Sequence, residues 1–130
     1  MLEEYERRLA VIAPIFLRSK ELNPTYFPIE CDDGWFFILK DSLSKIESIN
    51  SFHKDMKIIA DQIKEKFGVL NIFFHIEGSY DENLLNDIKK IIEDLEERSW
   101  RTCEHCGEPA TRTTSGWIKR LCDKCFEERQ

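Results

Sequence analysis

The 130-residue sequence predicts an α+β fold, in which a mostly helical N-terminal domain with at least one β-strand, expected in a hairpin, is fused to a small C-terminal module. First, apolar residues follow the helical period over most of the first 100 residues. Second, residues 69–76 are rich in branched and aromatic side chains, which is typical of a strand. Third, two Cys-x-x-Cys pairs lie near the C-terminus. These observations predict two domains, residues 1–100 and a four-cysteine zinc finger over residues 101–130.

The first predicted helix runs from Leu2 to about Lys20, where apolar residues recur at helical spacing. Pro14 lies inside this pattern, so we expect a break or kink near Ala13, because proline removes a backbone donor and clashes with the preceding turn. Residues 23–28 contain two prolines and are predicted to form a loop.

A second helix is predicted after Asp33, a candidate N-cap, with an apolar stripe from Trp35 to Ile49. Residues 56–67 also show helical spacing, and Gly68 would end that helix. A lone strand is unstable, however, and the strand over residues 69–76 needs a partner. The alternative is therefore that residues 58–65 supply the neighbouring strand, against their helical periodicity.

The next helix is predicted from a capping box, in which Ser79 would cap the first turn and Glu82 would bond back to it. Its apolar stripe continues to about Ser99, and the helix leads directly into Trp100 and the cysteine module. No Gly-rich or Pro-rich linker lies at this junction, so we expect the finger and the helix to form one rigid unit. Trp117 is the tryptophan that we expect to be buried at the junction, more than Trp100.

The four clustered cysteines predict a metal site with the ligands Cys103, Cys106, Cys122 and Cys125. Two residues between cysteines allow both thiolates of a tight turn to face one ion, and two such turns supply a tetrahedron, the closed arrangement of a structural zinc site. A redox dithiol would normally occur once, within a thioredoxin-like pattern, and a secreted disulfide framework would spread its cysteines along the chain. We therefore expect one structural Zn²⁺, whose removal unfolds mainly residues 101–130.

The order of elements in the finger predicts a treble-clef or ribbon-like architecture. A first knuckle is followed by a hairpin around Ser115 and Gly116, a strand over residues 117–121, and a second knuckle that opens a short helix over residues 126–130. Four thiolates leave no open coordination position, and the sequence shows no set of nucleophile and base. We therefore predict that the protein is not an enzyme.

Composition and charge indicate the compartment and the class of partner. No apolar run approaches the roughly 20 residues of a membrane span, and the acidic N-terminus differs from a signal peptide, so we expect a soluble, cytoplasmic protein without membrane contact. Residues 1–100 carry 13 Lys and Arg against 20 Asp and Glu. Because this balance repels polyphosphate, nucleic-acid binding should be weak and confined to the finger, where the candidate residues are Arg112, Lys119 and Arg120.

The remaining reactive or charged side chains have simpler explanations. His105, His75 and His53 lack partners in sequence, and Cys31 lacks an activating base, so we interpret them as bystander, structural or inert groups. An acidic cluster near the end of the long helix is either a solvated face or a docking surface for a basic partner; it comprises Glu93, Asp94, Glu96 and Glu97.

Several motifs occur in order along residues 34–125: Gly34-Trp35, Lys64-Glu-Lys-Phe-Gly68, Ser99, Cys103-Glu-x-Cys106-Gly107, Gly116-Trp117 and Leu121-Cys122-Asp123. In this combination the chain resembles a family of small, mostly uncharacterised phage and prophage proteins that end in a four-cysteine finger. The resemblance implies a mobile-element origin and a β-hairpin around residues 64–68.

The finger alone, in the motifs Cys103-Glu-His-Cys106-Gly107 and Leu121-Cys122-Asp-Lys-Cys125, also resembles that of the DksA/TraR transcription regulators. Those proteins insert a coiled coil with an acidic tip into the secondary channel of RNA polymerase, and this chain lacks a long coiled-coil pair.

The leading functional hypothesis is a non-enzymatic zinc-binding interaction protein of phage type that docks on a host protein and modulates it, as an inhibitor or regulator of a defence or nucleic-acid-processing machine. The alternative is a nucleic-acid-binding or RNA-polymerase-binding transcription regulator that acts through the finger. Neither the partner nor the oligomeric state follows from the sequence.

Overall fold

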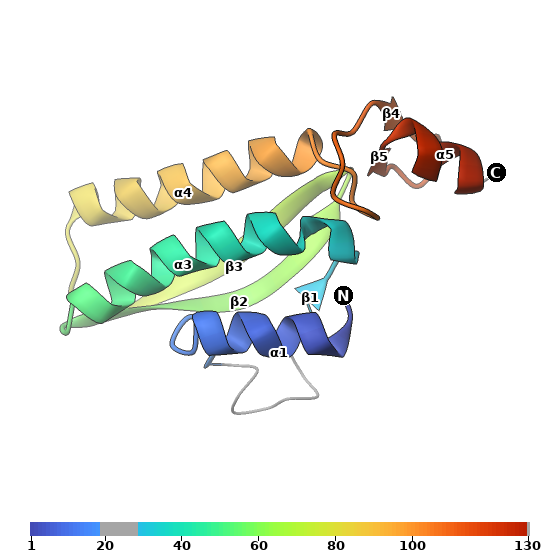
Figure 1. Ribbon diagram of the computed structural model, residues 1–130. Coiled ribbons are helices and arrows are strands. Elements are labelled where there is room, and N and C mark those ends of the chain that lie inside the picture. Colours follow the sequence, from blue (N-terminus) through green and yellow to red (C-terminus); the bar gives the residue numbers. More distant parts are fainter. Residues whose placement is uncertain (19–28, 130) are drawn as a thin grey trace.

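The computed structural model describes residues 1–18 and 29–129 and confirms the predicted α+β class. Three helices, α1 (Glu3–Ile12), α3 (Phe36–Phe52) and α4 (Glu82–Trp100), lie over one face of a three-stranded sheet, and the cysteine module lies at one end of this layer pair (Figure 1). Among the described residues, no helix is both long and apolar enough to cross a membrane.

Helix α1 ends at Ile12, as the position of Pro14 predicts. The chain then runs along the sheet, where Phe16 is fully buried and its carbonyl accepts a hydrogen bond of 2.8 Å from the N–H of Ala60. The loop predicted over residues 23–28, and the predicted end of the first helix near Lys20, lie outside the described residues.

Helix α3 follows a short 3-10 turn, η1 (Asp33–Trp35), and buries the predicted apolar stripe. The prediction that Asp33 caps this helix is wrong, because its Oδ1 instead accepts a 2.8 Å hydrogen bond from the N–H of Leu2. This carboxylate therefore joins the start of α1 to η1 across 31 residues of sequence.

The sheet has the strand order β1 (Ile29–Glu30), β2 (Met56–Lys66), β3 (Val69–Gly78). The central strand β2 pairs in parallel with β1 and antiparallel with β3. The strand predicted over residues 69–76 is confirmed, whereas the helix predicted over residues 56–67 is wrong and the alternative strand is correct.

A β-bulge explains why the sequence of β2 resembles a helix. The register with β3 shifts between Ala60 and Gln62, so that Asp61 is an extra residue in the strand. Before the bulge, Ile58, Ile59 and Ala60 are all almost completely buried, and after it the next fully buried residue is Ile63, three positions beyond Ala60. A strand with such a skip shows the three-to-four residue period that usually indicates a helix.

The N-cap of α4 is Asp81, whose Oδ1 accepts a 2.8 Å hydrogen bond from the N–H of Leu84. The predicted capping box is therefore wrong. Ser79 still belongs to the end of the hairpin, because Gly78 has a φ of 94° and the N–H of Ser79 bonds to the carbonyl of Asp55. Asp81 supplies a side-chain acceptor to the first turn, and Asp is favoured at a helix N-terminus.

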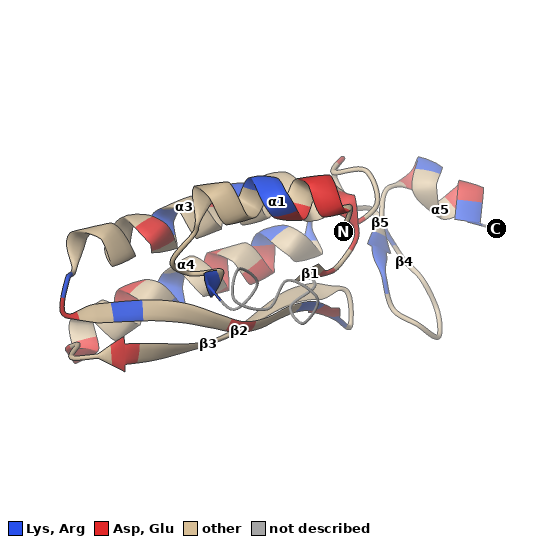
Figure 2. Cartoon of the chain, turned by 90° about the horizontal axis from the view of Figure 1, so that it is seen from below, with Lys and Arg blue, Asp and Glu red and all other residues tan. Residues whose placement is uncertain are grey.

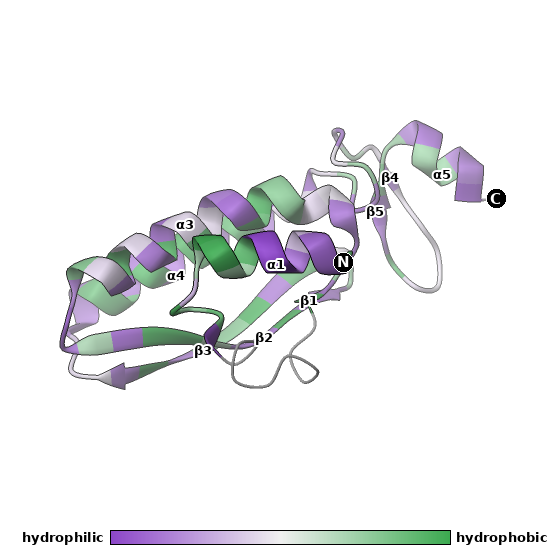
Figure 3. Ribbon diagram, turned by 60° about the horizontal axis from the view of Figure 1, so that its bottom comes forward, coloured by the Kyte–Doolittle hydropathy of each residue, from purple (hydrophilic) through white to green (hydrophobic). Residues whose placement is uncertain are grey.

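The helices and the sheet enclose one hydrophobic core, in which Trp35, Phe16, Leu39, Leu43 and Leu70 are almost completely buried. Hydrophobic segments alternate with hydrophilic ones along the helices and the two long strands (Figure 3). This pattern is expected where helices and strands each bury one face.

Candidate metal centre

The cysteine module has the order knuckle, hairpin and helix. The first cysteine pair follows α4, the strands β4 (Arg112–Thr113) and β5 (Arg120–Leu121) pair antiparallel, and the second pair lies at the start of α5 (Asp123–Arg129). This arrangement agrees with the predicted treble-clef type of finger. The hairpin forms around residues 115–116 as expected, although β5 is shorter than the strand predicted over residues 117–121.

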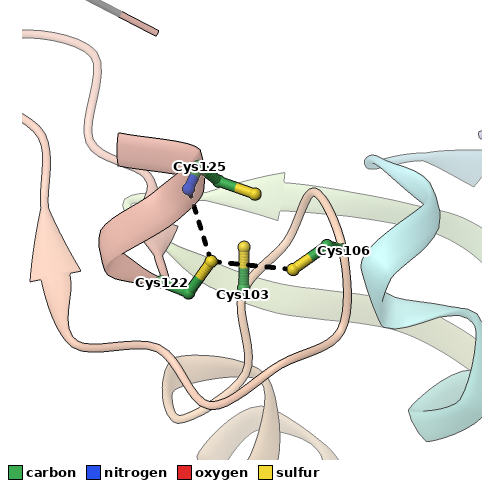
Figure 4. A group of neighbouring side chains, drawn as sticks. All are labelled: Cys103, Cys106, Cys122 and Cys125. Atoms are coloured by element: carbon green, nitrogen blue, oxygen red, sulfur yellow. Dashed lines mark hydrogen bonds between the residues drawn. The ribbon is translucent and has the colours of Figure 1, made fainter. Parts of the chain in front are cut away.

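The sulfur atoms of Cys103, Cys106, Cys122 and Cys125 all lie within 4.8 Å of one another (Figure 4). The Sγ atoms of Cys106 and Cys122 are 3.7 Å apart. A tetrahedral ion with metal–sulfur bonds of about 2.3 Å would place its ligands roughly 3.8 Å apart. The four side chains therefore fit a single metal ion, and such a soft donor set suits thiophilic cations.

Burial opposes ionisation of three of the four thiols, Cys103, Cys106 and Cys125. Burial raises the pKa of the Cys125 thiol, and hydrogen bonds that its S–H donates to the neighbouring cysteine sulfurs raise it further. Burial also raises the pKa of Cys106. For Cys103, burial alone would raise the pKa, but backbone N–H groups, that of Cys122 first, lower it. Metal binding should accordingly release protons from this cluster.

The metal centre is attached to the rest of the protein through the residue after its first ligand. Glu104 is only 1% exposed, its carbonyl accepts a 2.7 Å hydrogen bond from the N–H of Gly34, and its Oε2 accepts one of 3.0 Å from the N–H of Asp32. The finger and the start of α3 are thus joined by backbone as well as side-chain hydrogen bonds. An acceptor removed here would leave buried donors unsatisfied.

A lysine completes this contact. Lys119 Nζ lies 3.2 Å from Glu104 Oε1 and 3.2 Å from Asp32 Oδ2. Burial alone would lower the pKa of Lys119, but the two carboxylates outweigh it and raise that pKa. The pKa of Glu104 is raised, chiefly by burial. The pair formed by Glu104 and Lys119 lies largely out of water, with side chains that are 1% and 18% exposed. Loss of one member of such a pair is costly, because the other is left buried without a partner.

The backbone of the finger approaches the chain so closely before α3 that position 34 must be glycine. A Cβ on Gly34 would lie 2.3 Å from the carbonyl oxygen of Cys103 and 2.4 Å from that of Glu104, so only glycine allows this contact. The next residue, Trp35, is fully buried and donates from Nε1 to the carbonyl of Thr102 over 3.0 Å. Trp35 therefore contacts both the core and the finger.

The sequence did not predict these junction contacts: Trp35 was expected only as the start of an apolar helix stripe, and Gly34 only as part of a resemblance motif. The sequence holds two Gly-Trp pairs, Gly34-Trp35 and Gly116-Trp117, and it contains no signal that shows which of them lies at the junction. The expectation that Trp117 is buried at the junction is wrong, because that side chain is 72% exposed. Trp100 is 40% exposed, and the Arg120 guanidinium stacks 4.3 Å from its ring.

The basic residues proposed for nucleic-acid contact are engaged within the chain. Arg120 donates to the carbonyls of Trp100 and Ala110 and to the hydroxyl of Thr113. Arg112 lies over the Phe126 ring at 4.0 Å, and Lys119 is paired as described above. Figure 2 shows acidic and basic residues interspersed along the helices, with no continuous basic stripe in that view.

The other candidate residues are not among the four clustered cysteines. His105 is exposed between two ligand cysteines, and His53 is the C-cap of α3. His75 lies on β3, where its Nδ1 is 2.7 Å from Asp61 Oδ1. Cys31 is buried, and burial raises the pKa of its thiol, as expected for an inert group.

The acidic cluster on α4 is partly paired within its own helix, where Arg98 lies 4.0 Å from Asp94 and Arg101 lies 3.5 Å from Glu97. Such i,i+4 pairs are ordinary features of a solvated helix face.

Comparison of the chain with protein-family models, with curated protein sequences and with solved structures finds no match.

Proposed function

We propose that this chain is a non-enzymatic zinc-binding interaction protein of the phage or mobile-element type, which docks on a host protein and modulates it. The observation that carries the proposal is the closed cluster of four sulfurs, all within 4.8 Å of one another, on a finger bonded to the α/β layers. Four thiolates hold Zn²⁺ without an open position, so its role is structural.

The electrostatics support a protein partner over a nucleic acid. The chain has a formal net charge of −6, and the finger's strongest candidate cations are engaged internally. Phosphate binding depends on several available Lys and Arg side chains, because each contact releases counterions. An acidic protein of this kind is suited to a basic protein surface, including one that normally binds nucleic acid.

Zinc can be tested directly by elemental analysis of freshly purified protein, with one Zn²⁺ per chain as the expected result. Cys106→Ser should lose the ion, and Cys31→Ala, which alters the cysteine outside the cluster, should retain it. Absence of zinc from the unmodified protein, or full zinc retention in Cys106→Ser, would contradict the assignment.

Docking can be tested by affinity capture from the natural host, with and without chelator. We expect a specific protein that is retained by the wild-type chain and by Cys31→Ala but lost with chelator or in Cys106→Ser. Sub-micromolar binding to a defined nucleic-acid sequence at about 150 mM salt would instead favour a nucleic-acid-binding regulator that acts through the finger.

A further inference from the structure

Strand β3 lies at an edge of the sheet, because the strand order is β1, β2, β3. Its residues 69–76 contain no Lys, Arg, Asp, Glu or Pro. The central strand β2, in contrast, carries five charged side chains: Lys57, Asp61, Lys64, Glu65 and Lys66. Edge strands that remain single are usually protected by charges, proline or bulges, whereas strands with a neighbour on each side need no such protection. The edge strand of this sheet therefore has the composition expected of a central strand.

Near the hairpin, the backbone of β3 directs every second residue away from β2. The N–H of Leu70 donates to Ser99 Oγ over 2.9 Å, so this residue bonds to α4 and not to its neighbouring strand. In an antiparallel pair, residues that bond to the neighbouring strand alternate with residues that do not. Ile72, two positions further along, therefore also directs its N–H and carbonyl away from β2.

Beyond the bulge, the hydrogen bonds of β2 show the same orientation for Phe74 and Ile76. Ala60, which is opposite Phe74, donates its N–H to the carbonyl of Phe16 over 2.8 Å. Ile58, which is opposite Ile76, bonds through both its N–H and its carbonyl to a side chain of α3. Because these groups of β2 point away from β3, the residues opposite them also point away from β2.

Three residues of the edge are thus left with outward-facing backbone groups: Ile72, Phe74 and Ile76. No hydrogen bond joins these outward groups to any residue of the described ranges 1–18 and 29–129. The free stretch is limited at one end by Leu70, whose N–H is occupied by α4, and at the other by Gly78, which has a φ of 94°. The edge can therefore accept one short additional strand.

Apolar side chains that are only partly buried accompany this edge. Phe74 and Ile76 of β3 pack against the core at its margin, as do Leu84 and Ile91 of α4, the helix that packs against β3. On the opposite face of the sheet, Phe73 is 46% exposed. A strand added to β3 would cover apolar area on both faces and would form main-chain hydrogen bonds.

The sequence of the free edge indicates a second copy of this chain as the occupant. Residues 72–76 are Ile-Phe-Phe-His-Ile, which is nearly the same in both directions. Antiparallel pairing of two copies would place Phe74 opposite Phe74 of the partner subunit and Phe73 opposite His75 of the partner subunit, and the isoleucines would pair with each other. All three free residues would then exchange hydrogen bonds, and no two like charges would be opposite each other. A strand from another protein would not account for this symmetry.

We propose that the chain forms a two-fold dimer in which β3 pairs antiparallel with β3 of a second copy, centred on Phe74, so that the two sheets become continuous. Such self-complementary contacts are the commonest kind in homo-oligomers. The finger lies at the hairpin end of β3, where Gly68 is beside Trp100 and Ile118 (Figure 1). The two fingers of the dimer are therefore held at opposite ends of the joined sheet.

Sedimentation equilibrium of the zinc-loaded full chain tests the dimer, with a thiol reductant present and with protein from about 10 µM to about 500 µM. We expect the average mass to rise with concentration toward twice the 15.5 kDa of one chain. A mass that stays at one chain throughout this range would overturn the proposal.

NMR of an equimolar mixture of isotope-labelled and unlabelled chains tests the register. We expect a contact between the Hα of Phe73 and the Hα of His75 of the partner subunit, because pairs that are not hydrogen-bonded bring the two backbones closest. The amide of Phe74 should exchange at least 10-fold more slowly in the dimer than in the dilute monomer. A dimer without this Hα contact and without this protection would use another surface, and the proposal would fail.

Ile76→Pro tests the free edge. Proline is tolerated where the N–H of an edge strand faces solvent, but it removes a donor that the dimer requires. We expect the dissociation constant to rise at least 10-fold, with the melting temperature of the dilute protein within about 5 °C of the wild type. Ile76→Val keeps the donor and an apolar side chain, and this matched control should dimerise like the wild type. Unchanged dimerisation of Ile76→Pro would contradict pairing through β3.

Phe73→Thr is a second variant that does not depend on the tolerance of proline. Thr favours strands, and the side chain that it replaces is half exposed, so the monomer should keep its fold. The dissociation constant should rise at least 3-fold, because the contact with His75 of the partner subunit is lost. If the chain instead remains monomeric and a captured host protein slows exchange of the Phe74 amide, the edge receives a strand of that protein and the second-copy proposal fails.

Discussion

The α/β layers and the cysteine finger are stabilised by different means. The layers bury large side chains such as Trp35, Phe16 and Leu39, whereas the described part of the finger buries Cys103, Leu121 and Cys125 as its hydrophobic cluster. Burial of apolar area stabilises a large core, but a module of about 30 residues needs cross-links or metal. The two regions therefore differ in how much apolar area they bury, and the finger has four clustered cysteines where the layers have a large core.

The boundary between the two regions is made mainly of buried polar contacts. Glu104 and Lys119 of the finger bond to Asp32 and Gly34 next to α3. Such contacts are directional and lose much of their value when one partner moves. The finger's metal should therefore influence residues of the α/β layers that lie far from it in sequence.

Removal of the metal should produce the largest difference in stability between the finger and the α/β layers. Zinc in small modules contributes on the order of 10 kcal/mol to folding, so chelation or Cys106→Ser should unfold residues 101–129. Because Gly34, Asp32 and Trp35 bond to the finger, amide exchange should also accelerate at residues 32–36, while β2 and α3 beyond Leu39 stay protected. Hydrogen exchange by mass spectrometry checks this, and unchanged protection at residues 32–36 would contradict the coupling.

Loss of the Glu104 carboxylate should have the next largest effect. Glu104→Ala removes the acceptor of the Asp32 N–H and the carboxylate beside the partly buried Lys119, and we expect a loss of about 3 kcal/mol in the free energy of unfolding. Glu97→Ala, which removes the exposed pair with Arg101, is the matched control and should cost less than about 0.5 kcal/mol. Denaturant titration of zinc-loaded protein measures both, and equal losses would show that the junction is not desolvated.

Gly34→Ala and Gly116→Ala together should separate the loss of stability caused by a steric clash from the loss caused by backbone strain. Its Cβ would collide with the carbonyls of Cys103 and Glu104, so we expect a loss of about 2 kcal/mol. Gly116→Ala, at a φ of 74° with no atom within 4 Å of the new Cβ, should cost only about 1 kcal/mol from strain. Thermal unfolding compares the two variants. A Gly34→Ala protein as stable as the wild type would argue against the close packing of finger and α3.

The smallest expected effect lies on the sheet, away from the finger. Burial alone would lower the pKa of His75, but its bonds to Asp61 and Glu77 raise it above the ordinary value of about 6.5. The resulting stability is therefore fully present below about pH 6.5 and is lost as the pH rises through the folded-state pKa. Because the side chains are half exposed, the effect should not exceed about 1 kcal/mol.

Melting temperatures of the wild type and of His75→Gln between pH 5 and pH 9 check this prediction. The difference in stability between the two should shrink as the pH rises. A difference that grows with pH would contradict the assigned direction.

Features that depend on neighbouring residues could be predicted from the sequence. Helix α4, strand β3, the break at Pro14 and the metal-ligand set each follow from spacing or composition within one segment. The cysteine pairs are the clearest case, because a two-residue spacing restricts where both sulfurs can point, whatever the rest of the chain does.

Features that depend on distant residues could not be predicted in this way. The bulge at Asp61 gives β2 a helix-like period, and only pairing with β1 and β3 makes that segment a strand. Likewise, Asp33 and Ser79 are both reasonable caps by composition, yet one bonds to Leu2 and the other ends a hairpin.

The sequence by itself determined the α+β class, the long amphipathic helices and the four thiolates that gather around one point. Only the tertiary structure decided that Trp35 rather than Trp117 is buried at the junction, and that Glu104 is the acceptor for backbone 70 residues away. The physical reason is that periodicity reports which face of an element is apolar, whereas a buried polar contact depends on the exact approach of two backbones. Here that approach was set by Gly34, whose missing Cβ makes room for the finger.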